Sequence, residues 1–558
     1  MTAVRGLAQA RASPLALEAA GATALAAALA IPVSLVALAA PAAVAWAAVG
    51  VGSACFGAAA LVGWQRPLLP VGAFLLWTAL QRTAAALVSP HAEAEAVQAL
   101  LAYKEGMYLA LLAAGLTTAG RRLLAGERLP LLWPDALAVA FLLLVGAHFL
   151  VSDAAFADRL TYLRRWWAPC LLYLAGRLLW PEARAWRRAA LAFALLMVAV
   201  AAFGLVERFA LPPSFWTGQV PSVSLYRRLT EAGAIPSDWL FVYRGLPDGV
   251  LVSLPLEVPV RRLVSTFLEP TTLAFALALA ALLAAGALAA ARGRPRWAWT
   301  AALALLASAL LFTTGRGGML AALAGLALLG AAWALRAWPR AWTALVPAAP
   351  AVVLTGAALA LGLAVTSAAH LPARERVEDF LLWSANMPPP QVGAVPPPTA
   401  TGGSPPPAFD HPPGSAAEGA SRHLQGLREG LEQALDSPLG LGLGQAGVWS
   451  AAPEVGGEST IGALAAQLGL PGLLLWGGFA LLLGVALALS GLRQGDDALA
   501  APALALAAAL VGLLVASWFT ESASGVTGVA AYFLLAVWGL PALGARVLLL
   551  PWPKGGRA

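Results

Sequence analysis

Cysteine and charge are both scarce in this chain. Only two cysteines, Cys55 and Cys170, occur in 558 residues, and both fall inside apolar runs. That placement argues against a disulfide and against a thiolate metal site, and it carries no information about the compartment. Charged residues are 11% of the chain, hydrophobic residues are 60%, and the mean hydropathy is +0.77. Because apolar runs of about 20 residues recur throughout, a soluble domain is excluded and a polytopic membrane protein is expected.

Lysine is scarce as well, since only two of the 35 basic residues are lysines. The net charge of +7 therefore comes from arginine, a bias that a GC-rich genome can produce, and it does not indicate nucleic-acid binding. No group of His, Asp and Glu has the spacing of a metal site, and the outer loops contain no paired aspartates. We expect no metal and no cofactor. The N-terminus lacks a convincing cleavage site and is interpreted as a retained first span.

The apolar runs predict an all-α fold with about fourteen transmembrane helices. They cover residues 20–40, 42–64, 68–88, 101–119, 132–152, 166–180, 189–207, 264–291, 297–314, 318–335, 342–366, 460–490, 499–519 and 525–549. No internal repeat is evident, which counts against a transporter built from inverted halves.

Arginines in the short loops set the predicted orientation. One side of the bundle holds Arg5, Arg11, Arg66, Arg121, Arg122, Arg128, Arg184, Arg187, Arg188, Arg292, Arg294, Arg296, Arg336, Arg340, Arg493, Arg546, Lys554 and Arg557. By the positive-inside rule this side is cytoplasmic, and both termini lie on it.

The chain divides into five predicted segments. Residues 1–207 form a scaffold of transmembrane helices, 208–263 an outer loop, 264–366 further helices, 367–459 a long outer loop, and 460–558 the C-terminal helices. The long loop contains a Pro-rich insert at 387–414, which cannot form a packed core. Residues 421–436 then predict an amphipathic helix that is capped by Ser421 and stopped by Pro438. Its apolar stripe would lie on a membrane or bundle surface, and consists of Leu424, Leu427, Leu431 and Leu435.

The outer side is unexpectedly rich in arginine. It holds Arg159, Arg164, Arg165, Arg227, Arg228, Arg244, Arg261, Arg262, Arg316, Arg374, Arg376, Arg422 and Arg428. A bundle that keeps cations where topology disfavours them is expected to hold an anion there. Arg316 lies between two apolar runs joined by almost no loop. Inserting an arginine at this depth costs about 3 kcal/mol of free energy unless the side chain faces protein, water or an anion. Its planar fork suits bidentate phosphate contacts.

Each of these arginines also has a simpler interpretation. Arg316 would reach lipid headgroups or pair with Glu269, and Arg261 would be a solvated neighbour of Arg262. The group of Arg159, Arg164 and Arg165 would bind lipid headgroups.

Three motifs between residues 262 and 475 carry a resemblance to a known family. RRLVSTFLEPTTLA, which contains Arg262, looks like an arginine placed before a Phe and a helix start. TTGRGGMLAAL, which contains Arg316, is similar to a Ser/Thr–Arg–Gly motif at the outer end of a span. Glu458 to Gly472 reads E-S-(nine residues)-G-L-P-G, similar to H-[N/S/Q]-(nine residues)-G-x-x-G. In order and placement these motifs resemble the O-antigen ligase and O-antigen polymerase superfamily.

The resemblance implies a glycosyltransferase fold of the GT-C type that moves lipid-diphosphate-linked glycans at the periplasmic face of the bacterial inner membrane. Ligases carry a histidine where this chain has Glu458, and a second one where it has Leu475. That departure disfavours transfer to a lipid A core. The run HLQGLREGLEQALDSPLGLGLG looks closer to the polymerase branch, whose long outer loop brings a basic residue, here Arg422, toward a Gly-rich stretch.

Such chemistry needs cations for the diphosphate and a base for the incoming hydroxyl. Arg262, Arg316 and Arg422 would hold the diphosphate, one well-placed donor being worth roughly 10²–10³ in rate. Glu458 is the first candidate base and His423 the second. Each has an alternative interpretation, Glu458 as a helix cap and His423 as a surface residue. The remaining expected substrate-binding residues are Arg261, Arg165, Arg428 and Glu269.

The resemblance therefore predicts a polymerase of polysaccharide or lipopolysaccharide biosynthesis. Its donor and acceptor would be undecaprenyl-diphosphate-linked oligosaccharides, and its other partners membrane lipids and a chain-length regulator, with no nucleic acid. The alternatives are an O-antigen ligase or protein O-oligosaccharyltransferase of the same fold, and more distantly a lipid or solute transporter. A transporter would need a second gate of buried charges on the cytoplasmic side, which the spans are not expected to hold.

Overall fold

The computed structural model describes residues 14–39, 41–62, 68–127, 131–179, 183–211, 262–337, 349–367, 416–447, 459–520 and 527–542, with a few isolated positions between them. The Pro-rich insert at 387–414 and most of the loop at 208–263 lie outside this part of the chain. Among the described residues of this loop, the two-residue strands β1 (Val252–Ser253) and β2 (Pro259–Val260) form an antiparallel pair.

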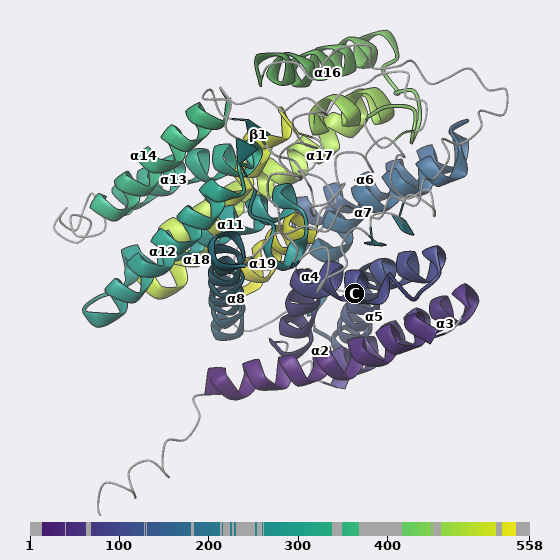
Figure 1. Cartoon of the computed structure of the whole chain (residues 1–558), viewed down its shortest axis with the longest axis horizontal. Coiled ribbons are helices and arrows are strands. Elements are labelled where there is room, and N and C mark those ends of the chain that lie inside the picture. Colours follow the sequence, from purple (N-terminus) through teal and green to yellow (C-terminus); the bar gives the residue numbers. More distant parts are fainter. Residues whose placement is uncertain are drawn as a thin grey trace, which may run out of the picture.

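Helices make up almost all of the described chain (Figure 1). They are α2 (Pro14–Ala39), α3 (Ala42–Val62), α4 (Leu68–Val88), α5 (Ala94–Leu124), α6 (Trp133–Val151), α7 (Phe156–Leu179), α8 (Ala183–Ala210), α11 (Pro270–Ala290), α12 (Arg294–Phe312), α13 (Arg316–Ala337), α14 (Ala349–Ser367), α16 (Ala416–Asp436), α17 (Thr460–Arg493), α18 (Asp497–Ser517) and α19 (Thr527–Ala542), together with the short 3₁₀ turn η2 (Ser265–Phe267). Ten of the helices in the described residues are long and apolar enough to cross a membrane. The expectation of a polytopic helical membrane protein is confirmed, while the count of fourteen spans and the GT-C architecture stay predictions.

Small residues allow the central helices to approach closely. Helix α11 is apolar all round, and 83% of its most apolar window is buried, against 28% for α12 and α6. A Cβ added at Gly512 of α18 would lie 2.1 Å from the Ala321 carbonyl oxygen of α13, and one added at Gly286 of α11 would lie 2.9 Å from the Ala501 carbonyl oxygen. Helices in lipid associate through such close packing, because lipid tails are as apolar as leucine. The centre of the bundle is formed by α11 and α18, and α13 packs closely against both.

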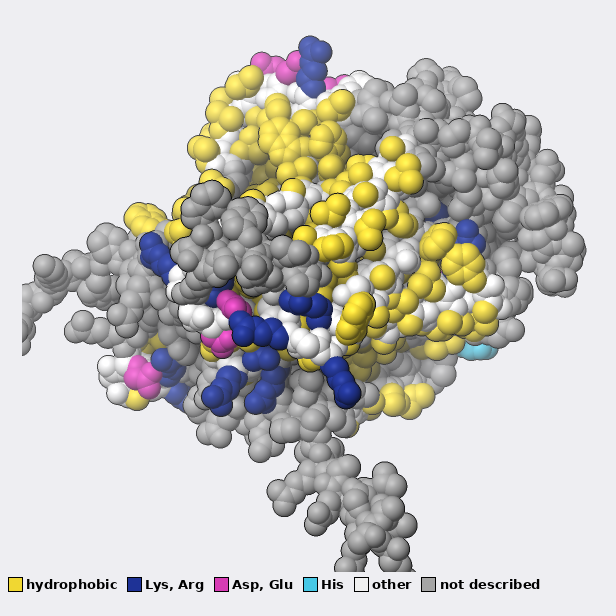
Figure 2. All heavy atoms as spheres, turned by 90° about the vertical axis from the view of Figure 1, so that its left-hand side faces the viewer, with side chains coloured by type: hydrophobic (Ala, Val, Ile, Leu, Met, Phe, Trp, Pro, Cys, Tyr) yellow, Lys and Arg dark blue, Asp and Glu magenta, His cyan; other side chains and the backbone are white. Residues whose placement is uncertain are grey.

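The outer surface separates apolar from charged side chains. Figure 2 shows a broad area of hydrophobic side chains, with Lys and Arg gathered below it and a small charged group above it, over α16. Large apolar side chains are also exposed on α6 and α17, for example Leu150 at 78%, Leu474 at 74% and Leu143 at 70%. A surface of this kind matches the hydrocarbon of a bilayer rather than water.

Helix α17 is broken near its start, a feature that its unbroken apolar sequence does not predict. Gly469 has φ 63° and ψ −160°, and the chain turns there. A Cβ at Gly469 would lie 2.1 Å from the carbonyl oxygen of Pro438, so only glycine fits. Thr460 and Trp476 line one small hollow, although a straight helix would place them about 24 Å apart. The nine residues between Ser459 and Gly469 therefore form a separate short helix that folds back against the rest of α17.

The Gly-rich corner, residues 437–447, fills this break. The N–H groups of Leu441 and Gly442 donate to the carbonyls of Ala466 and Gln467, over 2.8 and 3.1 Å, and the N–H of Leu470 donates to the Pro438 carbonyl over 2.9 Å. These bonds satisfy the backbone groups that an interrupted helix leaves free. The buried side chain of Gln467 completes the joint, because it donates to the Ala446 carbonyl and accepts from Trp166 Nε1.

Helix α16 ends where the sequence indicates, at Asp436, but it begins at Ala416 rather than after Ser421. The capping role expected for Ser421 is wrong, because the alanine-rich turn before it continues the helix. The face packed on α17 is made of glycine: a Cβ at Gly430 would lie 2.2 Å from the Gly462 carbonyl oxygen. The leucine stripe is turned sideways, and Leu424 and Leu435 are 50% and 70% exposed. The helix lies on the surface of the bundle, as predicted.

Two ion pairs, one of them buried, occur at the end of the bundle where α6 and α18 begin. Arg177 of α7 donates from Nε and Nη2 to the two carboxylate oxygens of Asp135, each over 2.9 Å, and Tyr173 donates to the same carboxylate. Arg336 of α13 binds Asp497 of α18 over 2.8 Å. The expectation that the spans hold no buried charge at this end is therefore wrong. Both pairs are saturated with partners and join helices, so they do not by themselves indicate a gate.

Candidate anion site at the starts of three helices

The first two motifs are joined by hydrogen bonds. Arg262 donates from Nε to the Thr313 carbonyl over 2.9 Å, and the N–H of Leu263 donates to the Phe312 carbonyl over 2.8 Å. Arg262 lies just before η2 and the start of α11, while Thr313 follows the last residue of α12. The arginine of the first motif is thereby fixed beside the turn that carries the second.

The turn between α12 and α13 is only three residues long. Thr313 donates from its hydroxyl to the Leu310 carbonyl and accepts from the N–H of Gly315 over 3.1 Å, and Thr314 has a φ of 51°. Arg316 then begins α13. A Cβ at Gly318 would lie 2.6 Å from that of Ala274 in α11. The glycines beside Arg316 thus let α13 start directly against α11, which confirms the expected absence of a real loop here.

The start of α17 meets the start of α13 through Thr520. Ser459 caps α17 by accepting from the N–H of Gly462 over 3.0 Å, and the N–H of Thr460 donates to the Thr520 carbonyl over 3.2 Å. A Cβ at Gly317 would lie 3.1 Å from the methyl group of Thr520. The third motif therefore begins at the same end of the bundle as the first two.

Three helix N-termini converge at this end, those of α11, α13 and the short first part of α17. The first N–H groups of a helix have no partner within it, and the helix dipole places partial positive charge there. Together with Arg262 and Arg316 they make a concentrated positive region, which is the arrangement that binds phosphate and other anions.

The two arginines of this region differ in their hydrogen bonding. Arg262 is held by the Thr313 carbonyl, whereas half-buried Arg316 makes no hydrogen bond or ion pair with any of the described residues. The hydroxyl groups of Thr266 and Thr314, on the two adjoining turns, are buried without a hydrogen-bond partner. The site therefore contains a guanidinium and two hydroxyls that are available for a ligand.

Glu269 is occupied by other residues. It accepts from Arg82 Nη2 over 2.6 Å and from the Thr272 hydroxyl over 2.6 Å. The sequence left open a pair between Glu269 and Arg316, but the partner in the structure is Arg82 of α4. Glu269 thus has a structural contact that fixes α4 against the start of α11, and Arg82 is a neighbour of the site that the sequence reasoning missed. Its signal was a single arginine inside an apolar run.

The other predicted site residues are less closely associated with this end. Arg165 is half-buried on α7, with its guanidinium 5.9 Å from the ring of Tyr162. Arg428 is exposed on α16, and its hydrogen bond with Glu432 over 2.7 Å raises the pKa of the guanidinium above its ordinary value. Its contact is thus with Glu432 rather than with Arg262 or Arg316. Arg261 and Glu458 lie outside the described residues, as do the side chains of Arg422 and His423 in α16.

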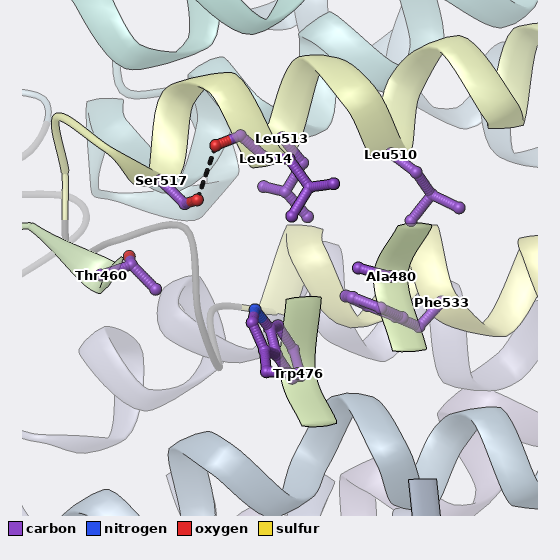
Figure 3. A pocket seen from close by; sticks show the side chains of 8 residues that line it. All are labelled: Thr460, Trp476, Ala480, Leu510, Leu513, Leu514, Ser517 and Phe533. Atoms are coloured by element: carbon purple, nitrogen blue, oxygen red, sulfur yellow. Dashed lines mark hydrogen bonds between the residues drawn. The ribbon is translucent and has the colours of Figure 1, made fainter. Parts of the chain in front are cut away.

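A small apolar hollow lies beside the start of α17 (Figure 3). Thr460 and Ser517 provide its polar edge, and Ser517 donates to the Leu514 carbonyl over 2.7 Å. Trp476, Leu510 and Phe533 are among the side chains that form its apolar wall. Its volume of about 10 Å³ is room for about one water molecule, so it does not hold a lipid chain as it stands.

Comparison with known protein families and curated proteins identifies no relative. No protein-family model matches the chain, and a search among curated proteins finds no match either. The family remains a resemblance that rests on the three motifs.

Proposed function

We propose that this protein is a lipid-linked glycan polymerase of the bacterial inner membrane. It transfers a growing glycan from undecaprenyl diphosphate to the non-reducing-end hydroxyl of another lipid-linked repeat unit, at the periplasmic face and without a metal. The observation that carries the proposal is the convergence of Arg262, Arg316 and three helix N-termini at one end of an apolar bundle. Permanent positive charge at that depth suits a diphosphate whose lipid part lies in the bilayer.

The reaction needs one bond broken and one formed. The bond between the anomeric carbon and the diphosphate oxygen breaks, and the electron pair leaves with the diphosphate. The anomeric carbon bonds to the acceptor hydroxyl oxygen, whose proton passes to a base. Arg316 stabilises the charge that grows on the leaving diphosphate, because its fork has no protein partner among the described residues. Glu458 is the proposed base, since it directly precedes the cap of α17, and His423 is the alternative.

Two other assignments use the same geometry. A ligase or protein O-oligosaccharyltransferase would bind the same donor and differ only in the acceptor, so the acceptor found on the product separates them. A transporter would have to open the opposite end of the bundle, where the Arg177–Asp135 and Arg336–Asp497 pairs join the helices. Those pairs would then be the gate.

The test is polymerisation by the purified protein in lipid, supplied with a defined lipid-diphosphate oligosaccharide. The wild type should give a ladder of products, with and without chelator. Arg316→Lys keeps the charge but loses the bidentate fork, and Arg262→Ala loses the contact with Thr313, so each should leave single-repeat glycans and lower the rate by about 10²–10³.

The matched control is Arg121→Gln. Arg121 is an exposed arginine in the last turn of α5, at the end of the bundle away from the anion site, so this variant should retain the ladder. Long chains from both Arg316→Lys and Arg262→Ala would show that these arginines do not hold the diphosphate. A wild-type product attached to a lipid core or a protein would show a ligase or an oligosaccharyltransferase instead.

A further inference from the structure

A second group of charged side chains lies inside the spans, between α4, α5 and α7. It comprises Arg82 of α4, Lys104 and Glu105 of α5, Arg164 of α7, and Glu269 at the start of α11. The helices α4 and α7 both pack on α5, and Lys104 is close enough to Arg82, Arg164 and Glu269 for their charges to act on it. Lys104 lies about 15 Å along α5 from its first residue, so the group is within the apolar part of the bundle.

The acids in this group do not balance its cations. Glu269 is taken by Arg82 and the Thr272 hydroxyl, so Glu105 is the remaining acid of the group, against the two cations Lys104 and Arg164. The contact from Lys104 Nζ to Glu105 Oε1 is 3.8 Å, and the side chains are 21% and 23% exposed. Arg164 forms no hydrogen bond or ion pair within the part of the chain that the structure describes. One positive charge is therefore in excess at a depth where an unpaired cation is costly.

Several polar atoms here have no partner although they are buried. They are Arg164 Nε, Glu105 Oε2 and the hydroxyl of Tyr108, whose side chain is only 2% exposed. Tyr108 lies one turn along α5 from Lys104, and the charges of both Glu105 and Arg164 act on its hydroxyl. Two of these three atoms are hydrogen-bond donors beside an ammonium group. Unsatisfied buried donors next to excess positive charge indicate a place for an anionic acceptor.

We infer that Lys104, Tyr108 and Arg164 form a second anion site, which binds a phosphate group carried by a membrane lipid. Arginine offers a planar fork, lysine a mobile ammonium and tyrosine a hydroxyl donor, a combination suited to phosphate oxygens. Because the group lies between membrane-spanning helices, a lipid can bring its headgroup there while its chains stay in the bilayer.

The second site adjoins the first across one short segment, residues 262–269. At one end of this segment Arg262 binds the Thr313 carbonyl. Further along, the Thr266 carbonyl accepts from Thr83 of α4 over 2.7 Å, and Glu269 binds Arg82. Ser265 and Leu268 have φ of 48° and 51°, which holds the segment in a tight bend. The lipid's identity rests on the proposed function, in which two lipid diphosphates, a donor and an acceptor, take part in each transfer. The first site then binds the donor's diphosphate, and the second site binds the acceptor's.

The experiment counts diphosphate sites on the full-length protein in detergent by equilibrium binding of radiolabelled farnesyl diphosphate. The wild type should bind two molecules. Lys104→Met combined with Arg164→Met should weaken one site at least tenfold and leave the other unchanged, whereas Arg316→Gln should weaken only the other. Tyr108→Phe keeps the edge-on ring contact with Phe74 and should weaken the second site about fivefold. Arg121→Gln, on the same helix as Lys104, should still bind two.

Three results would overturn the inference. The double variant could keep both sites, or lose both while melting at the wild-type temperature. Inorganic diphosphate could bind the second site as tightly as farnesyl diphosphate, which would make the ligand a free anion. Displacement of farnesyl diphosphate from it by phosphatidylglycerol at equal concentration would instead contradict only the assignment of this site to the acceptor's diphosphate, because the ligand would then be an ordinary phospholipid.

The inference and the proposed function fail separately. A wild type that binds two diphosphates but makes no glycan ladder contradicts the polymerase alone. A wild type that makes the ladder but binds a single diphosphate contradicts the second site alone.

Discussion

Individual charged residues in this bundle fall into two kinds, those saturated by partners and those left with free donors. Asp135 belongs to the first kind, since it accepts from Arg177, Tyr173 and the N–H of Leu132. Arg316 and Arg164 belong to the second kind within the described residues. A saturated pair stabilises packing, whereas an arginine without a protein partner at similar depth is where a ligand is expected.

Asp135→Asn should destabilise the protein without changing its binding sites. The substitution removes the charge that Arg177 faces, and breaking one partner of a buried pair costs about 3–5 kcal/mol. The melting temperature in detergent should fall clearly, and the double variant Asp135→Asn with Arg177→Met should recover part of the loss. If the single variant melts as the wild type does, the pair contributes nothing to stability.

The sequence could single out these residues but could not pair them. Arg262 and Arg316 were expected at one outer site because each precedes a span, and the structure brings their turns together. The partner of Glu269 could not be predicted, since α4 and α11 are far apart in the chain and only their packing brings Arg82 to it. Lys104 and Arg164 were not grouped for the same reason.

Among the elements, α17 shows most clearly how distant segments decide local structure. Its sequence is apolar on both sides of Gly469 and Pro471 except for Gln467, so hydropathy predicts one long span. The break forms because the corner at 437–447 inserts its backbone there and satisfies the freed groups. A glycine followed two residues later by proline inside an apolar run was the available signal. The backbone of the corner packs directly against α17.

Gly469→Ala should therefore disrupt the site, whereas Gly477→Ala in the same helix should not. The added methyl at Gly469 meets the Pro438 carbonyl and the residue must keep a positive φ, which costs about 1–3 kcal/mol before the clash is counted. Nothing lies within 4 Å of a Cβ at Gly477. We expect a lower melting temperature and loss of one diphosphate site for the first variant only. Equal behaviour of the two would mean that the break does not position the site.

At the scale of the whole molecule, the described helices place the three motifs at one end and the ion pairs Arg177–Asp135 and Arg336–Asp497 at the other. Composition and hydropathy were enough to predict a helical membrane bundle and the approximate position of its helices. They could not predict which helices are central, because α11 and α6 have similar apolar content but differ in burial. That difference comes from packing alone.

The predicted orientation can be tested with single cysteines in a background of Cys55→Ala and Cys170→Ala. Asp153→Cys lies in the exposed turn between α6 and α7, at the end that holds the motifs, and Arg121→Cys lies at the other end. A membrane-impermeant maleimide applied to spheroplasts should label the first and reach the second only after the membrane is opened. The reverse pattern would place the motifs in the cytoplasm and exclude a periplasmic reaction.

The meeting of three helix starts has a consequence for how such a protein can change over time. Much of the attraction for an anion there comes from peptide N–H groups, which every amino acid except proline supplies. Side chains around them can drift a long way while the electrostatic character of the place persists. In such a bundle, common ancestry would then remain detectable in the backbone fold long after sequence similarity has been lost.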